Sequence, residues 1–160
     1  MRRHLLAGRF GPDDQTEIPH ADDEQLTQLP LVVTERILDH GIGGALASLR
    51  SLGVFPSEIG LDLLVLAAHV HAADTRISRE GQSQDSWTRE IRLVVPVSDP
   101  ERWQAAASTL MRTLGFLTGD RWTVAFRRRP ERFASLAPPP VTLLPPSFNA
   151  VSLFSGGLED

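Results

Sequence analysis

The sequence predicts an α+β domain, in which a small sheet packs with two long helices, followed by a Pro-rich linker and the first strand of a further α/β domain. Three observations support this architecture. Residues 59–73 are apolar nearly all round a helix, as expected of a buried helix. A second helix with regular apolar spacing follows Asp99, and it lies between segments 88–97 and 121–127. In both segments apolar and polar residues alternate, which is the pattern of a half-buried strand.

The first forty residues contain an expected short strand, RRHLLAGRF, and a second apolar segment, LPLVVTERI. Between them, residues 11–25 are rich in Pro, Asp and Gln, which favours a surface excursion over a packed element. The β-branched residues around 31–37 predict a strand. A helix that continues through Leu38 fits the same residues.

Glycine and proline mark the boundaries of the first two expected helices. A glycine-rich stretch at 41–44 interrupts the preceding pattern, and a short helix is expected from Ala45 until Gly53. Pro56 and Ser57 suit the start of the long buried helix.

The strand–helix–strand region from Thr88 onward follows a polar connector at 74–87. Asp99 is a candidate N-cap of its helix, and Gly115 is expected to end that helix. This order leaves the helix packed on a sheet, and a short crossover helix would make the two strands parallel if they are neighbours. Pro96 lacks an N–H donor, so it indicates an edge strand or the end of a strand. The apolar positions of the helix are Trp103, Ala106, Ala107, Leu110 and Leu114.

Composition narrows the classes of protein that fit. The 160 residues, 41% hydrophobic and 22% charged, suffice for one globular domain of ordinary size. The net charge of −4 argues against general binding to nucleic acid, although it leaves room for a local basic patch. No apolar run has the length of a membrane span or the form of a secretion signal, so we expect a soluble, cytoplasmic protein without a membrane partner.

Cysteine and lysine do not occur in the sequence, and all 16 basic residues are arginines. Without cysteine, the sequence excludes disulfides, thiolate metal sites and cysteine nucleophiles. Without lysine, it excludes a Walker-type phosphate-binding lysine and Schiff-base chemistry in this segment.

The polar residues of the long buried helix, Glu58, Asp62 and His69, form one narrow stripe. Two interpretations fit the stripe: a solvated helix face, which we favour, or a catalytic set of carboxylate and imidazole groups. His69 and His71 are the most suggestive pair for a metal, but a spacing of two places them on different helix faces. We therefore expect neither a metal site nor a catalytic residue in this chain.

Four arginines, Arg127, Arg128, Arg129 and Arg132, lie close together after the last alternating segment. Such a cluster is able to bind phosphate groups or a nucleic-acid backbone. An ordinary basic strand end explains the same residues. We favour that second interpretation, because the net charge of the chain opposes broad binding to a polyanion.

The composition changes towards the end of the sequence. Residues 137–147 contain three consecutive prolines and then two more, which favours an extended linker. From Phe148 the sequence FNAVSLFSGGLED passes from a short apolar segment directly into glycines, as in a strand followed by a phosphate-binding loop. Glycines in such a loop let backbone N–H groups approach phosphate oxygens, and the following helix normally contributes its amino terminus.

This motif resembles the SGGxDS signature of the PP-loop ATP pyrophosphatases, and the form LFSGGLD is typical of QueC-like enzymes. The four residues SGGL match the signature. The next two depart from it, because Glu and Asp stand where the family has Asp and Ser. The nucleotide-binding residues that the resemblance implies are Ser155, Gly156, Gly157, Leu158, Glu159 and Asp160.

The upstream sequence is similar to the amino-terminal region of QatC proteins, the QueC-like components of the Qat anti-phage system. The similar segments are PSEIGLDLLVLAAHVHAADTRISRE, WTREIRLVVPVSDPERWQAA and LGFLTGDRWTVAFR. The resemblance implies that the full protein activates a substrate by adenylation with release of pyrophosphate, as QueC does with a deazaguanine carboxylate. It implies ATP and Mg²⁺ as cofactors of the full-length protein, and none for this piece alone.

We thus expect an amino-terminal α+β recognition domain over 1–136, a Pro-rich linker over 137–147, and the start of a truncated PP-loop domain, similar to adenine nucleotide alpha hydrolases, over 148–160. The whole protein would be a ligase or transferase in phage defence, similar to 7-cyano-7-deazaguanine synthase. Its partners would be other components of a Qat-like system and a nucleotide or deazaguanine-like substrate. The alternative is a non-catalytic module that binds protein or nucleic acid in a defence complex.

Overall fold

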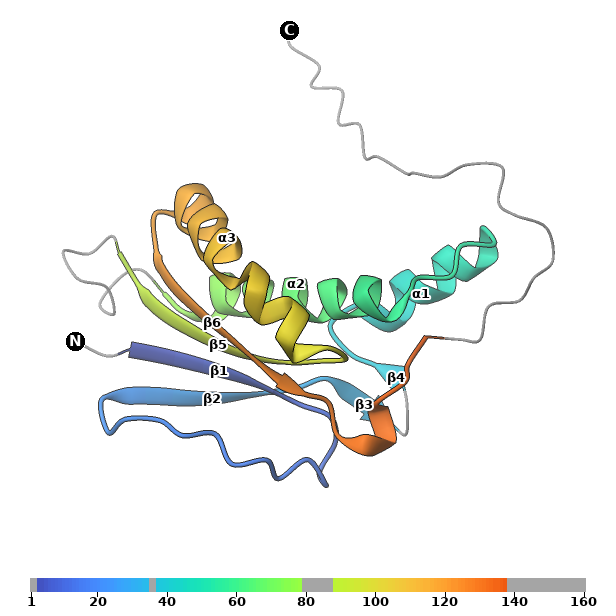
Figure 1. Cartoon of the computed structure of the whole chain (residues 1–160), viewed down its shortest axis with the longest axis horizontal. Helices are drawn as coiled ribbons and strands as arrows, with labels where there is room; N and C mark the ends of the chain where they lie inside the picture. The colour runs from blue at the N-terminus through green and yellow to red at the C-terminus, as the bar shows by residue number, and fades with distance from the viewer. Residues whose placement is uncertain (1–2, 35–36, 79–87, 138–160) are drawn as a thin grey trace, which may run out of the picture.

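The computed structural model describes residues 3–34, 37–78 and 88–137, and these form an α+β unit (Figure 1). It has three α-helices, a four-stranded parallel sheet and a small antiparallel strand pair. The elements in chain order are β1 (Arg3–Arg9), β2 (Glu24–Pro30), β3 (Val32–Thr34), β4 (Ile37–Leu38), α1 (Ile42–Ser51), α2 (Glu58–Arg76), β5 (Glu90–Val97), α3 (Pro100–Thr118), β6 (Arg121–Arg128) and a 3₁₀ turn, Glu131–Phe133.

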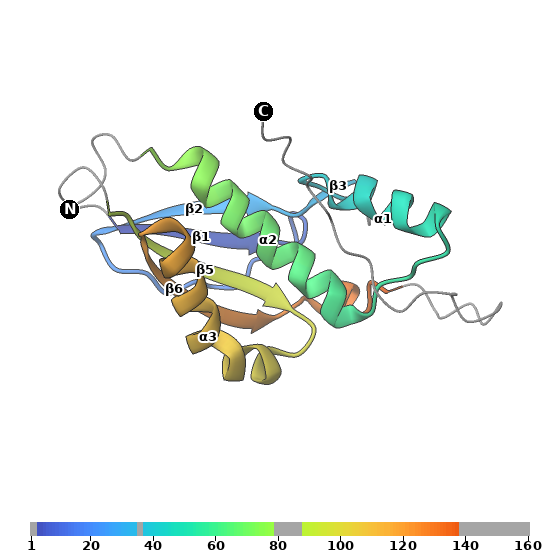
Figure 2. The same cartoon turned by 90° about the horizontal axis from the view of Figure 1, so that it is seen from above.

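The strand order of the main sheet is β2-β1-β5-β6, and every neighbouring pair is parallel. The strands β5 and β6 are neighbours joined through α3, so the expectation of a parallel pair with a crossover helix is confirmed. Helices α2 and α3 lie over one face of the sheet, and the irregular chain between β1 and β2 lies under the other (Figures 1 and 2).

Handedness explains this division of the two faces. Connections between parallel strands are almost always right-handed. The chain moves outward in one direction from β1 to β2, and in the opposite direction from β2 through β5 to β6. Right-handed crossovers therefore place the β1–β2 connection and the two helices on opposite faces. The connections leave in opposite directions from β1 and from β5, which makes the gap between these strands a topological switch point.

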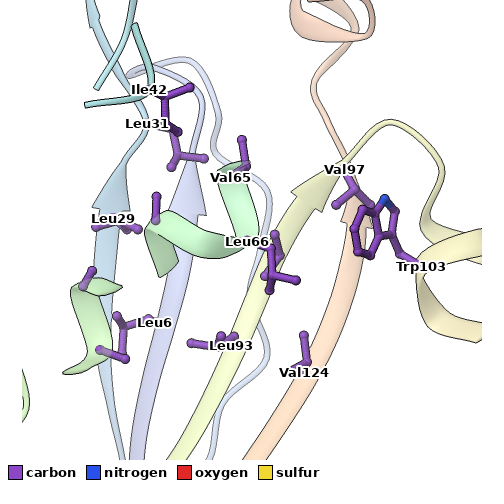
Figure 3. Close-up of a cluster of buried hydrophobic side chains, with 14 of the residues drawn as sticks. Leu6, Leu29, Leu31, Ile42, Val65, Leu66, Leu93, Val97, Trp103 and Val124 are labelled. Carbon is purple, nitrogen blue, oxygen red and sulfur yellow. The ribbon is translucent and has the colours of Figure 1, made fainter. Parts of the chain in front are cut away.

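The main core lies between α2 and the sheet. Figure 3 shows Val65 of α2 near Leu31 and Leu66 of α2 beside β5, in one buried cluster with Leu6 of β1 and Leu93 of β5. On the opposite face, Ile18 from the β1–β2 connection closes a smaller cluster formed by Leu5, Ala7 and Val94. Burial of one such aliphatic side chain contributes about 1.5–3 kcal/mol to holding the irregular connection against the sheet.

The structure corrects the expectations for the first forty residues. The expected strand at the start is confirmed as β1, but β2 begins at Glu24, inside the stretch expected to be a surface excursion. The apolar segment after Pro30 forms the short antiparallel pair β3–β4, in place of either the long strand or the helix considered for it. Strand β2 is an edge strand with only Leu29 fully buried, so it carries little of the alternation that would reveal a strand.

The long helices are confirmed, with two corrections to helix ends. Helix α1 begins at Ile42, within the glycine-rich stretch. Helix α3 begins as expected, since the Asp99 carboxylate accepts a hydrogen bond from the Arg102 N–H. It does not stop at Gly115, because Gly119 takes the left-handed conformation, with φ of 73°, that ends the helix.

The expected linker and the expected first strand of a second domain lie, from residue 138 onward, outside the described residues. Residues 79–87 of the polar connector lie outside them as well, and α2 extends into the connector as far as Arg76. Within the described ranges, no helix combines the length and apolar character that crossing a bilayer requires.

Candidate functional site

The carboxyl ends of β1 and β5 separate at the topological switch point. Their pairing ends at Ala7 and Val94, while β5 continues to pair with β6 up to Val97. Pro96 lies in the part of β5 that pairs with β6 but no longer with β1, and it has no N–H to donate to β1. Because β5 is a central strand, the expectation that Pro96 marks an edge strand is wrong, whereas it does lie beyond the end of one ladder. Ligands of parallel α/β sheets typically bind at such a position.

His69 of α2 fills this gap from the helix side. Its side chain is fully buried, and its Nδ1 lies 2.7 Å from the carbonyl oxygen of Val65. A carbonyl only accepts, so Nδ1 carries the hydrogen and Nε2 is left with a lone pair. Among the described residues Nε2 has no hydrogen-bond partner. Burial, and secondarily the charges of His40 and Arg127, lower the pKa of His69 to about 4, so the ring is neutral at physiological pH.

Gly8 of β1 makes room for this imidazole. A Cβ atom at Gly8 would lie 2.6 Å from Nε2 of His69 and 2.8 Å from Cδ of Pro96. Both separations are well below van der Waals contact, so glycine is required here for the helix to approach the sheet this closely.

Arg127 of β6 fills the same gap from the other face. Its Nη2 donates to the Gly8 carbonyl at 2.8 Å, and it also donates to the Asp14 carboxylate. Asp14 further accepts from the N–H of Phe10 at 2.9 Å and from the hydroxyl of Thr16 at 2.9 Å. Burial alone would raise the pKa of Asp14, but these hydrogen bonds and the guanidinium charge hold it below its ordinary value.

A second buried ion pair joins Asp62 of α2 to Arg129, and neither side chain is exposed. The Asp62 carboxylate also accepts from the backbone N–H of Ser98 at 2.9 Å, from the Ser98 hydroxyl at 2.7 Å and from Nε1 of Trp103 at 2.9 Å. Asp62 therefore connects α2 to the turn between β5 and α3. We call Asp14, Asp62, Arg127 and Arg129 the carboxyl-edge network.

Glu58, in the first turn of α2, extends this network to the end of the described chain. One carboxylate oxygen accepts from the Ser135 hydroxyl at 3.1 Å and from the N–H groups of Leu136 and Ala137, each at 2.7 Å. The other accepts from Nη1 of Arg129 at 2.7 Å. Burial would raise the pKa of Glu58, but these bonds lower it below its ordinary value. We call this arrangement the Glu58 clasp.

The polar stripe of α2 faces the protein interior. Asp62 and His69 are fully buried and Glu58 is half-buried, so the favoured interpretation as a solvated face is wrong. His71 is exposed, so the two histidines diverge as their spacing predicted. In residues 3–34, 37–78 and 88–137, no group of three or more histidine and acidic side chains is arranged to hold a metal.

The arginine cluster does not form one continuous basic surface. Arg127 and Arg129 point inward to the carboxylates of the network, whereas Arg128 and Arg132 are exposed. In the sequence, Arg127 and Arg129 are the first and third of three consecutive arginines, and nothing there distinguishes them from Arg128. Asp14, the partner of Arg127, carried no sequence signal either.

A surface hollow of about 580 Å³ lies beside the carboxyl-edge network. Asp14 and Arg9 contribute to its wall, and Arg9 holds the loop after β1 by donating to the carbonyl of Asp14 at 3.1 Å. Gln28 and Gln15 add neutral hydrogen-bonding groups. The hollow lies between the loop after β1 and the end of β2, on the β2 side of the switch point, and its polar wall comes from Arg9, Gln15 and Gln28 because the Asp14 side chain is fully buried. A small polar ligand fits such a wall.

A separate buried cluster at the opposite edge of the sheet has a structural role. The Arg89 side chain is almost completely buried and donates to the Asp120 carboxylate at 2.6 Å and to the carbonyl of Ile77 at 2.7 Å. It thus joins the end of α2 to the start of β6, and it lies away from the hollow.

The expected nucleotide-binding residues 155–160 lie outside the described residues. No protein-family model, curated protein or solved structure matches the chain.

Proposed function

We propose that this chain contains the amino-terminal recognition domain of a QueC-like ATP-dependent ligase or transferase that acts in bacterial anti-phage defence. The observation that carries the proposal is the closing motif, in which LFSGGL follows a Pro-rich segment and a short apolar run. ATP and Mg²⁺ would be held by residues 155–160 together with a helix that follows them.

The geometry of the carboxyl-edge network supports recognition, and not chemistry, as the role of residues 3–137. Its two arginines are paired with carboxylates inside the protein, and His69 is neutral and enclosed. A general base or nucleophile must reach the substrate directly. The hollow beside the network is better suited to bind part of a substrate, such as a nucleotide or a deazaguanine-like compound.

The Glu58 clasp supports the arrangement of the two domains in this proposal. It holds Leu136 and Ala137 at the start of α2, close to the carboxyl edge of the sheet. A second domain attached through residues 138–147 would thereby be tethered at this edge of the sheet.

Phage infection of cells that carry the gene with its neighbours tests the defence role and the motif together. The substitution Gly156→Val should raise the efficiency of plating at least tenfold, because the valine side chain blocks the approach of phosphate to the backbone. Ser152→Ala, just before the motif, is the matched control and should leave plating unchanged. The proposal is wrong if Gly156→Val plates phage like the unaltered protein.

A second experiment addresses the chain by itself. The purified 160-residue protein, incubated with ATP and Mg²⁺, is expected to release no AMP or pyrophosphate. Turnover by this chain would contradict the assignment of the chemistry to residues that follow it.

A non-catalytic binding module is the second candidate function. Exposed apolar side chains on and near the first two helices, Leu52, Phe55 and Leu63, favour it, because such side chains often mark protein contacts. This candidate predicts that Gly156→Val leaves defence intact. A nucleic-acid-binding version predicts an affinity that falls steeply with salt, which a titration with single-stranded RNA measures.

A further inference from the structure

Strand β6 is the outermost strand of the sheet, and within the described residues it pairs only with β5. The N–H of Arg121 donates to Arg89 at 2.9 Å, and the N–H of Arg129 donates to Val97 at 3.0 Å, so these amides point inward. Peptide groups of a strand alternate in direction. The N–H and C=O groups of Trp122, Val124 and Phe126 therefore point away from the sheet and form an open edge.

Helix α3 connects β5 to β6 but does not lie centrally over the two strands; it is displaced towards the outer edge of β6. It packs mainly over β6 and only slightly over β5, and Figure 2 shows it at the margin of the sheet. Only Trp103 and Ala107 of its 19 residues are buried. Near its end, Phe116 is 89% exposed and Leu117 is 71% exposed. One further strand beside β6 would lie along this margin of α3, where Leu117, three residues after the sheet-facing Leu114, is the apolar side chain that it can cover.

The charge around this edge is positive although the chain as a whole carries −4. Five arginines in residues 100–132 are exposed, against two exposed acidic residues, Glu101 and Glu131, and one of the five, Arg121, is paired with Glu90 at 3.1 Å. The exposed arginines are Arg102, Arg112, Arg121, Arg128 and Arg132. Arg121, 67% exposed, and Arg128, also exposed, lie at the two ends of β6. If the edges of two copies paired antiparallel about the middle of β6, both copies would bring the same net positive charge to the joint. Like charges brought together in this way disfavour such a dimer.

We propose that the open edge of β6 binds an extended segment of a partner protein in which apolar and acidic residues alternate. Backbone hydrogen bonds to the outward-pointing groups of β6 provide affinity. The apolar side chains of the added strand face α3, and the acidic ones face the side of the sheet that carries Arg121. The inference stands on β6 and α3 alone and does not depend on the proposed enzymatic role.

Amide hydrogen exchange measured by NMR tests this inference on the full chain. In the free protein, the amides of Trp122, Val124 and Phe126 should exchange at least tenfold faster than the inward amides of Thr123 and Ala125. If the outward amides are equally protected, the edge is already covered and the inference fails. The inference fails in this way whether the β6 edge is covered by another part of the same chain or by a second copy of it. Protection that depends on protein concentration would identify the second copy.

The probe for binding is a capped eight-residue peptide of alternating valine and glutamate. At low salt it should slow exchange of the three outward amides at least tenfold, and the same peptide with lysine for glutamate should bind at least tenfold more weakly. The substitution Arg121→Gln should weaken binding of the glutamate peptide at least fivefold. Arg50→Gln, at an exposed position of α1, is the matched control and should leave binding of the glutamate peptide unchanged.

Three results would overturn the inference. One is no protection of the outward amides by the glutamate peptide at about 1 mM. Another is equal binding of the lysine peptide. The third is protection of the same amides by oligouridine and not by the acidic peptide, which would assign the basic edge to nucleic acid.

Discussion

Acidification should destabilise the protein chiefly through His69, in a pH range where its carboxylates are still ionised. The pKa of His69 is lowered from 6.5 to about 4 in the folded chain, because the buried imidazole cannot easily take up a charge. In the unfolded chain the same ring titrates near its ordinary value. As the pH falls below 6.5, the unfolded state therefore binds a proton that the folded state does not.

The sign and size of the effect follow from linkage. Above pH 6.5 neither state is protonated, and stability does not depend on His69. Between pH 6.5 and 4 the unfolded state is favoured progressively, by about 2 kcal/mol at pH 5 and about 3 kcal/mol at pH 4. Below pH 4 both states are protonated and the loss stops. The carboxyls of Asp14 and Glu58, whose pKa values are lowered in the fold, add their own loss at more acidic pH.

Urea unfolding followed by tryptophan fluorescence at pH 7.5, 6.5, 5.5 and 5.0 measures this dependence. His69→Asn keeps a donor for the Val65 carbonyl and removes the titrating ring, so its free energy of unfolding should fall about 2 kcal/mol less than that of the unaltered protein between pH 7.5 and 5. His71→Asn makes the same change at an exposed position of α2 and should keep the full dependence. Parallel pH profiles for His69→Asn and the unaltered protein would refute the reasoning.

Three further substitutions test the packing of the candidate site. Gly8→Ala forces a methyl group against His69 and should lower the free energy of unfolding by about 1–3 kcal/mol in urea titrations, whereas Gly44→Ala, which has open space around it within α1, should be neutral or stabilising. Asp62→Ala leaves a buried guanidinium without its main counter-charge and should cost about 3–5 kcal/mol, and a loss below about 1 kcal/mol would show that the pair contributes little. Glu58→Ala should accelerate hydrogen exchange of the Leu136 amide at least tenfold while core amides change far less, and an equal change in both would contradict a local clasp.

The part of the fold that was predictable from the sequence is the part fixed by local interactions. The start of α3 depends on Asp99, whose carboxylate accepts a hydrogen bond from an N–H three residues later, and on the proline that follows Asp99. The alternation in β5 and β6 reflects burial on one face, mainly by α2 over β5 and by α3 over β6. Strand β2 was missed because its stability comes from pairing with β1 and from one buried leucine, neither of which is a local property.

The candidate site was predictable only in its components. The stripe on α2 was identified, but its orientation was not, because hydropathy alone does not reveal that Asp62 meets an arginine 67 residues later. The same limit applies to Asp14, which lies in a polar loop and pairs with Arg127, 113 residues away. Buried charges are stable only when paired. The pairing here arises because β1, β5 and β6 lie side by side in the sheet, which brings together residues that are far apart in the sequence.

Pro96 provides a single physical cause for the arrangement at the carboxyl edge. Since it cannot donate to β1, the carbonyl of Gly8 needs another donor, and Arg127 supplies one from the neighbouring strand. A guanidinium that reaches across β5 into the interior needs a counter-charge, and the loop after β1 provides Asp14. That loop is in turn one wall of the hollow in which a substrate would bind. Pro96 thus contributes to the shape of the hollow, together with Arg9 and the Phe10 amide, which hold the same loop.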